Sequence, residues 1–517
     1  MAFQSILFQS REAPAVHEAR AYCKDLNIDQ IVNAITAGWK EKDYDLKPLF
    51  YSPLRRVDDM QYRQEIMRDL ENETALCAVR VFARAVYTLE NSMRFTRKYL
   101  LSQDPYYCNY LQKGRLLESA AAYCAAVEKL AEDIAVPDLR SRGLAAFREY
   151  IASYKDSAAF TALQAETASM RAELSAVRYC MLIRNGSIKV RKYEGEADHT
   201  AEIEAIFERF KQGAVKDYRR DLPEEPYAEH VEAGVLNLVA RLYPEIFERL
   251  DRYCQKNLRF IDETIYAFSH EIQFYIAYLE YIGRFKRAGL RFCYPRMSGE
   301  SKEISSTNGF DMALADKLIA KSQPVVCNDF YLKGAERIIV VSGPNQGGKT
   351  TFARTFGQLH HFASLGCPIP GTEANLFVFD EIFTHFEKEE DINSLSGKLQ
   401  DDLVRMNGIL RQATPDSVII INEILSSTTL KDAVEIGKKI MEQVVRLDAL
   451  CIVVTFLDEL ASCSDKNVSM VSTVVPEDPA QRTFKIVRKP ADGLAYAMHI
   501  AAKYRLTYEC LKERIHA

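Results

Sequence analysis

The sequence predicts a C-terminal α/β domain over residues 301–517, preceded by a mainly α-helical domain over residues 1–300. Three observations lead to this prediction. A length of 517 residues exceeds one ordinary core, so we expect two to four domains. Apolar residues in the first part recur at steps of three and four, which is the helical period. After about residue 295, short apolar runs alternate with helical segments, which is typical of a mostly parallel sheet covered on both faces.

The helical pattern is clearest over residues 259–283. The apolar residues of this stretch share one face of a helix, which indicates helix packing rather than a cofactor site. They are Ile261, Ile265, Phe268, Ile272, Ile276 and Leu279. Long helices with few interruptions predict an elongated lever or an antiparallel coiled coil.

A small β-hairpin is predicted near residues 178–193, within the helical part. Asn185-Gly186 lies between two alternating runs, and this dipeptide favours the two left-handed positions of a type I′ turn. Basic residues on the hairpin form either a solvated face or a phosphate contact, and the acidic stretch that follows weakens the second interpretation. They are Arg178, Arg184, Lys189, Arg191 and Lys192.

Composition excludes several classes of protein. A net charge of −5, from 67 basic and 72 acidic residues, argues against a globally basic nucleic-acid coat but not against a local basic groove. Twelve scattered cysteines without a C-x-x-C pair indicate reduced thiols rather than disulfides or zinc ligands. We see no signal peptide and no run of 18 apolar residues, so we expect a cytoplasmic protein without a membrane partner.

The motif with the clearest chemistry is GPNQGGKT, residues 343–350, which fits the P-loop pattern G-x-x-x-x-G-K-[ST]. It follows the apolar run RIIVVS and precedes a helical run, which is the required strand–loop–helix context. Its glycines let backbone N–H groups approach phosphate oxygens. Lys349 can reach the β- and γ-phosphates, and the hydroxyl of Thr350 can ligate Mg²⁺. We therefore expect a P-loop NTPase domain that uses ATP and Mg²⁺, with Lys349 facing solvent.

The candidate ATP-binding residues are those of the loop and the start of the helix after it. They are Gly343, Pro344, Asn345, Gln346, Gly347, Gly348, Lys349, Thr350 and Thr351, with Thr350 also the candidate metal ligand.

The interior of this loop resembles the MutS family of DNA mismatch repair ATPases, whose loop reads G-P-N-x-G-G-K-[ST]. The resemblance continues through IFTH (382–385), NEILSSTTLKDA (422–433), VVTFLDEL (453–460) and GLAYAMHIAAKYRL (493–506), where family dimers pack. The first half matches more weakly, at DLKPLFYSPL and at Tyr62-Arg63-Gln64, which resemble the start of the family's lever domain. This resemblance implies an ABC-type ATPase domain with C-terminal dimerisation helices after a helical lever or clamp.

Two stretches compete for the Walker B strand, whose acidic end helps to hold Mg²⁺. NLFVFDEIF (375–383) places Asp380-Glu381 only 31 residues after Lys349 (380 − 349), at the family's I-F-T position. SVIIINEIL (417–425) lies 73 residues after Lys349 (422 − 349) and continues into the family's Thr and Asp positions. The resemblance therefore implies that Asn422 and Glu423 are the Walker B equivalent, with Glu423 as the catalytic base. We expect Asp380-Glu381 in a loop near the site.

Two residues depart from the family pattern. Asn422 replaces an aspartate, and Phe456 stands at the switch position, where the family has a histidine that senses the γ-phosphate. The family's trans signature loop, which reaches the partner's nucleotide, is represented by residues 393–403, with Ser394, Ser396 and Gly397 as candidates. The departures predict ATP binding in the normal range with slow hydrolysis.

The resemblance implies an ATP-dependent DNA-binding protein of the MutS mismatch-repair family, in a short form without the N-terminal mismatch-recognition and connector domains. We expect a homodimeric, nucleotide-gated clamp with weak ATPase activity. One alternative is an ATP-binding switch with negligible hydrolysis that acts on branched DNA, structured RNA or a ribosome. A general ABC-type ATPase for protein assembly is a further alternative, against which Pro344-Asn345 and the C-terminal helix argue.

Overall fold

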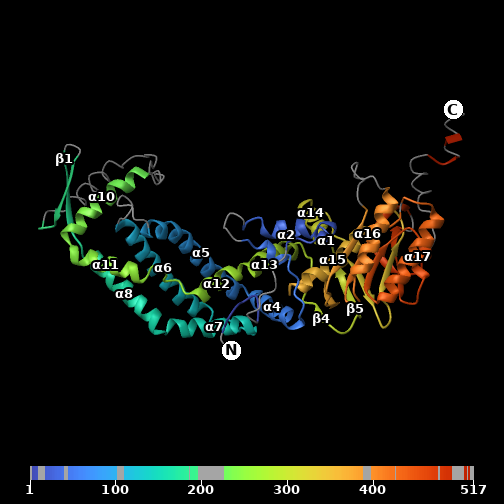
Figure 1. The fold of residues 1–517 in the computed structure, drawn as a ribbon, viewed down its shortest axis with the longest axis horizontal. Coiled ribbons are helices and arrows are strands. Elements are labelled where there is room, and N and C mark those ends of the chain that lie inside the picture. The colour runs from blue at the N-terminus through green and yellow to red at the C-terminus, as the bar shows by residue number, and fades with distance from the viewer. Residues whose placement is uncertain are drawn as a thin grey trace. The chain divides into compact units, whose positions relative to one another are not determined.

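The computed structural model describes residues 3–9, 18–39, 45–101, 110–184, 187–195, 226–387, 397–425, 427–475, 478–491, 506–508 and 511–512. The chain divides into two compact units. The first contains residues 74–138 and 146–270, and the second contains residues 3–73, 139–145 and 271–517. Figure 1 shows the fold and labels many of the elements that are named below.

The first unit is mainly α-helical. Its helices bury their apolar faces against one another, as in the contact of Phe147 with Phe268, whose rings stack with centroids 3.5 Å apart. The described helices that lie wholly or mostly in this unit are α5 (Glu73–Leu101), α6 (Tyr110–Asp133), α7 (Arg142–Lys155), α8 (Ala158–Ser175), α10 (Pro226–Leu242), α11 (Pro244–Lys256) and α12 (Glu263–Glu271).

The first unit also contains the hairpin predicted near residues 178–193. Strands β1 (Tyr179–Arg184) and β2 (Ser187–Lys192) pair antiparallel along their whole length. The turn residues Asn185-Gly186 lie outside the described residues. The ammonium group of Lys192 lies 5.1 Å from the ring centroid of Tyr243, so part of the basic face packs on its own unit.

The helix predicted over residues 259–283 is two helices, α12 and α13 (Gln273–Arg287), which belong to different units. Ile272 separates them but keeps near-helical backbone angles, with φ −63° and ψ −21°. The apolar period therefore continues across the break, and the sequence pattern does not reveal it.

The second unit is built on a six-stranded sheet with the order β10-β11-β12-β7-β13-β14. The first five strands run parallel, and β14 is antiparallel to β13. Strands β7, β11 and β12 are buried throughout, which explains their continuous apolar sequences. The elements are β7 (Ile338–Ser342), α15 (Lys349–Ser364), β10 (Ile382–Phe386), α16 (Lys398–Gln412), β11 (Val418–Asn422), α17 (Leu430–Leu447), β12 (Leu450–Val454), η2 (Asp458–Ser462), β13 (Asn467–Val475) and β14 (Asp478–Arg488).

Two smaller sheets belong to the same unit. One has four strands in the order β4-β9-β5-β6, and the other pairs β3 with β8. Residues 375–383 therefore do not form one strand, because they divide between β9 and β10. The elements are β3 (Phe292–Cys293), β4 (Arg296–Ser298), β5 (Ile304–Gly309), α14 (Met312–Ala320), β6 (Asn328–Leu332), β8 (Ile369–Pro370) and β9 (Glu373–Phe377).

Residues 3–73 pack within the second unit, whereas the sequence places the helical domain at residues 1–300. The N-terminal residues belong to the second unit because they form hydrogen bonds with helix α15 and its C-terminal end. The side chain of Gln358 donates to the carbonyl of Leu26 (2.9 Å), and Arg63 donates to the carbonyl of Leu365 (3.2 Å). These partners lie 332 and 302 positions apart, so no local pattern indicates them. The N-terminal helices are α1 (Ala21–Asp25), α2 (Ile28–Thr36), α3 (Lys47–Phe50) and α4 (Val57–Leu70).

No helix in the part of the chain that the structure describes is both long enough and apolar enough to cross a membrane.

Candidate nucleotide-binding site

The loop at residues 343–348 joins the end of β7 to the start of α15. Three of its residues have left-handed backbone angles: Gly343 (φ 114°), Gln346 (φ 58°) and Gly348 (φ 90°). Such turns direct successive N–H groups into one concave surface, which binds anions. The N-terminus of α15 adds partial positive charge at the same place. The loop therefore has the backbone geometry of a phosphate cradle.

Two glycines are required here because β13 lies directly behind the loop. A Cβ at Gly347 would meet Ser472 Oγ at 2.2 Å, and a Cβ at Gly343 would meet the backbone oxygen of Ser472 at 2.9 Å. The hydroxyl of Ser472 donates to the carbonyl of Gly347 at 2.6 Å. Ser472 thus supports the cradle from behind, and the loop motif alone does not identify it.

Lys349 is buried, with 4% of its surface exposed, so the expectation that it faces solvent is wrong. Its ammonium group donates to the carbonyls of Gly343 (2.9 Å) and Pro344 (3.0 Å) and lies 4.2 Å from the ring centroid of Phe456. Burial lowers the pKa of Lys349, and the nearby Glu423 opposes this shift. The lysine therefore lies along the inner side of its own loop, with its charge held by carbonyl dipoles and an aromatic face.

Thr350 and Asn422 meet at the edge of the sheet where the parallel strands end. Asn422 is the last residue of β11, and its Oδ1 accepts a hydrogen bond of 2.9 Å from the hydroxyl of Thr350. Asn422 is buried. The structure thus brings the candidate metal ligand Thr350 together with the residue that stands for the Walker B aspartate.

Glu423 follows directly and has a left-handed backbone (φ 56°), which is uncommon for a residue with a Cβ. Its N–H donates to the carbonyl of Val454 at 2.9 Å, so the peptide is fixed to β12 while the side chain leaves the sheet. Burial raises the pKa of Glu423, Lys349 opposes this rise, and the charge of Glu387 adds to it. A carboxylate that holds a proton more tightly than usual suits a general base.

Glu387, whose charge helps to raise the pKa of Glu423, is a residue that the sequence did not indicate. It follows β10 directly and forms an ion pair with Lys398, the first residue of α16. The IFTH segment was a signal for a strand at this place, but only the pairing of β10 with β11 shows that the strand ends beside Asn422.

Two exposed aromatic rings flank the loop. Phe456 follows the end of β12 and is 50% exposed. Phe484 lies on β14, is 48% exposed and has φ 58°. A Cβ at Gly348 would lie 3.7 Å from the side chain of Phe484. Phe484 is a third residue that the sequence did not indicate, because its position depends on a local left-handed turn within a strand.

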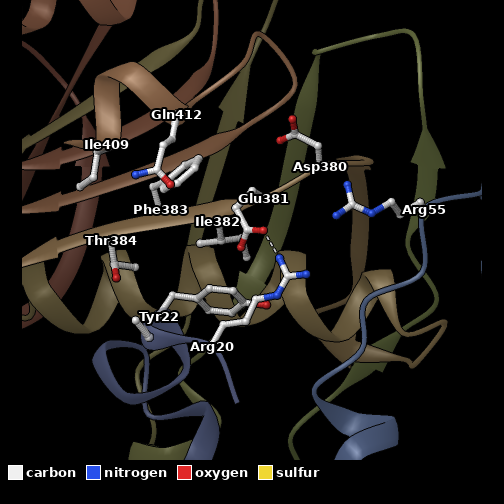
Figure 2. A pocket seen from close by; sticks show the side chains of 11 residues that line it. Arg20, Tyr22, Arg55, Asp380, Glu381, Ile382, Phe383, Thr384, Ile409 and Gln412 are labelled. Carbon is white, nitrogen blue, oxygen red and sulfur yellow. Dashed lines mark hydrogen bonds and ion pairs between the residues drawn. The ribbon is translucent and has the colours of Figure 1, made fainter. Parts of the chain in front are cut away.

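Asp380 and Glu381 do not lie near this site, and the expectation that they do is wrong. They precede β10, and Ile382 pairs with Val418 at the start of β11, whereas Asn422 is at its end. Figure 2 shows Glu381 paired with Arg20, with Asp380 beside the same pocket. Asp380 accepts a hydrogen bond from Ser417 (2.8 Å). Both carboxylates are therefore held at the opposite end of the strand.

The remaining candidates occupy several places. Asn345 accepts a hydrogen bond from Arg482 on its carbonyl (3.2 Å), and Thr351 lies in the first turn of α15. Gly397 is the N-cap of α16. Ser394 and Ser396 lie outside the described residues, as do residues 493–505 of the predicted dimerisation helix.

The residues present fit a nucleotide with Mg²⁺. The cradle has no space for a Cβ at Gly343 or Gly347, so only glycines allow its close backbone turns. A hydroxyl and an amide oxygen, both hard oxygen donors, face each other where the metal of a P-loop site is held. Comparison with protein families gives a match of residues 339–513 to the model of MutS domain V, the P-loop ATPase domain of that family.

This part of the chain is similar to the MutS family.

Curated relatives match the same C-terminal part. One is an endonuclease MutS2 from Gemmatimonas aurantiaca, 30% identical over 192 residues, which are 37% of this chain and 23% of the relative. Another is a DNA mismatch repair protein MutS from Caldicellulosiruptor bescii, 30% identical over 207 residues, which are 38% of this chain and 24% of the relative. The match thus spans about a quarter of the length of these MutS proteins.

Proposed function

We propose that this protein is a member of the MutS family and acts as a nucleotide-gated, homodimeric DNA clamp that binds ATP with Mg²⁺ and hydrolyses it slowly. The hydrogen bond between Thr350 and Asn422 is the main support, because it unites the P-loop helix with the end of β11. DNA as the ligand class is supported by the similarity to MutS domain V and by the relative that is a DNA mismatch repair protein. The cytoplasm remains the location that reduced cysteines favour.

Each residue of the site has a role in this proposal. Backbone N–H groups of residues 343–348 and the start of α15 bind the phosphates. Lys349 exchanges two carbonyl partners for phosphate oxygens, which form stronger, charge-assisted hydrogen bonds. Thr350 and Asn422 face the metal position, and Glu423 orients the attacking water. Bound Mg²⁺ supplies charge neutralisation of the phosphate oxygens.

Slow turnover follows from Asn422. An amide oxygen accepts a hydrogen bond or a metal contact but carries no formal charge. Magnesium is usually held through carboxylates and phosphates, so one missing carboxylate weakens its capture. Phe456 has a similar consequence, because its ring cannot donate a hydrogen bond to the γ-phosphate. These two residues also favour the alternative, an ATP-binding switch with negligible hydrolysis.

Homodimer formation and the choice of nucleic acid are proposed from the family resemblance. Of the three candidate residues of the trans signature loop, the described one is Gly397, at the N-cap of α16. Structured RNA or a ribosome remains the alternative partner.

The test measures binding of the purified protein to labelled duplex DNA, a DNA junction and structured RNA, each with ATP, ADP and no nucleotide. We expect DNA binding whose affinity changes with ATP, and the Lys349→Ala variant should lose this change while keeping nucleotide-independent binding. If the protein binds the RNA but neither DNA, structured RNA or a ribosome becomes the proposed partner instead of DNA. Identical affinity with and without nucleotide would contradict the gated clamp.

A further inference from the structure

Asn422 carries no negative charge at the proposed metal position. The sheet register shows which acidic residue of the neighbouring strand β10 follows the end beside Asn422. In the parallel pair of β10 with β11, Phe386 is opposite Asn422. The next residues, Glu387 and Glu423, therefore leave the sheet from neighbouring strand ends. Parallel strands place their carboxyl ends at one edge, and this edge carries the P-loop.

The other acidic residues of this strand segment lie too far away. Asp380 and Glu381 precede Ile382, which pairs with the first residue of β11. Five residues of strand at about 3.3 Å each separate them from the phosphate-binding edge, a distance on the order of 15 Å. Glu381 also pairs with Arg20, and Asp380 accepts hydrogen bonds from Thr414 and Ser417.

Glu387 has a partner that it can exchange. Its ion pair with Lys398 is partly exposed, with 40% of the Glu387 side chain and 27% of the Lys398 side chain accessible. Ion pairs at such exposed positions contribute little stability, because water solvates both charges almost as well. Replacing the ammonium group of Lys398 by a divalent cation therefore breaks a partly exposed ion pair rather than a buried one.

We propose that Glu387 makes up part of the negative charge that Asn422 lacks, so that the metal of the bound nucleotide is held among Thr350, Asn422 and Glu387, more weakly than with an aspartate at the end of β11. This inference rests on the proposed ATP-binding function of the same site. It also gives metal capture a structural consequence. When Glu387 leaves Lys398, the first turn of α16 loses an ion pair, and this turn begins at Gly397 of the candidate signature loop.

The experiment compares Glu387→Gln with the natural protein, using a fluorescent, non-hydrolysable ATP analogue titrated at a series of Mg²⁺ concentrations. Mn²⁺ binding to the protein–analogue complex, followed by electron paramagnetic resonance, gives a second readout without turnover. We expect unchanged affinity for the metal-free analogue and a half-saturating metal concentration raised about tenfold or more. Adding Asn422→Asp to Glu387→Gln should restore metal capture.

Two control variants distinguish the loss of a metal ligand from the loss of a carboxylate elsewhere on the strand and from the loss of the ion pair with Lys398. Glu381→Gln removes a carboxylate from the same strand at its far end and should leave metal capture unchanged. Lys398→Gln removes the same ion pair but keeps Glu387, and it should not weaken metal capture. Natural-like metal binding in Glu387→Gln, or equal weakening in Lys398→Gln, would overturn the proposal. Failure of the natural protein to bind the analogue at all would instead refute the proposed ATP site.

Discussion

The hydroxyl of Thr350 and the amide oxygen of Asn422 are 2.9 Å apart and hydrogen-bonded, although 72 positions separate them in the chain. This contact shows that β11, and not the segment around Asp380, ends at the P-loop helix. It also shows what the substitution of aspartate by asparagine keeps and what it loses. The acceptor oxygen and its direction remain, whereas the negative charge is absent.

Replacing Lys349 by alanine should abolish ordinary ATP affinity. The variant loses charge-assisted hydrogen bonds to phosphate, each worth roughly 1.5–3 kcal/mol, so we expect a decrease of about 100-fold. The fold should persist, because the change removes a buried charge rather than an apolar core group. Isothermal calorimetry measures the affinity, and thermal unfolding checks the fold. The control is Lys439→Ala, which changes an exposed lysine of α17. An ATP affinity of Lys349→Ala equal to that of the natural protein would contradict the assignment of the nucleotide site.

Substitution of Gly397 by aspartate should disturb assembly but not folding. A Cβ at Gly397 meets no heavy atom within 4 Å, so the protomer has space for a side chain. In an ATP-bound dimer the added charge would face the partner's phosphates and repel them. Sedimentation with ATP should then show a dimer for the natural protein and a weaker dimer for the variant. Gly408→Asp on the same helix, also in open space, is the control. A natural protein that stays monomeric at every concentration and nucleotide state contradicts the expectation.

Acid should destabilise the second unit through two histidines of α15. Burial lowers the pKa of both His360 and His361 to about 4, from an ordinary value of 6.5. Their contribution is complete above pH 6.5 and is lost as the pH falls towards 4, because the unfolded chain binds protons that the folded chain cannot. The loss is about 3 kcal/mol for each histidine.

The His360→Leu variant separates this effect from general acid denaturation. Urea midpoints measured from pH 7.5 to pH 4.5 should fall less steeply in the variant than in the natural protein. Val404→Ala, at an exposed position of α16 without a titratable group, is the control and should leave the slope unchanged. A slope in His360→Leu identical to that of the natural protein would show that His360 does not carry this dependence.

Removal of Arg63 should destabilise the contact between α4 and α15. Arg63 is 1% exposed, donates to the carbonyls of Leu7 (3.1 Å) and Leu365 (3.2 Å), and lies 4.9 Å from the ring centroid of Phe274. Arg63→Ala leaves two buried carbonyls without this donor, so we expect a loss of about 3 kcal/mol in the free energy of unfolding. Chemical denaturation measures it. Arg56→Ala, at an exposed position, should change stability by less than about 0.5 kcal/mol.

The sequence predicted those parts of the site that depend on local pattern. Strand β7, the turns of the loop and helix α15 follow one another in the chain, so apolar runs, glycines and helical period identify them. Asn422 was also placed correctly at the end of a buried strand, because SVIIIN is a continuous apolar run.

Other parts depend on contacts between distant residues and have no local signal. The position of Glu387 follows only from the pairing of β10 with β11. The same register shows that Asp380 lies at the other end of the strand, away from the site. Ser472 supports the P-loop from a strand 125 positions later. The N-terminal residues join the second unit through single side chains such as Arg63, whose position on a helix resembles that of any surface arginine.

The most direct test of the account is the steady-state ATPase rate of the natural protein and of Asn422→Asp, measured over a range of Mg²⁺ concentrations. An aspartate at this position restores the charge beside Thr350, so we expect turnover to rise by about tenfold and half-saturation to move to lower Mg²⁺. The natural protein should bind ATP but turn over slowly throughout the range. Brisk turnover of the natural protein at low Mg²⁺, with no change in Asn422→Asp, would contradict the assignment of β11 as the metal-holding strand.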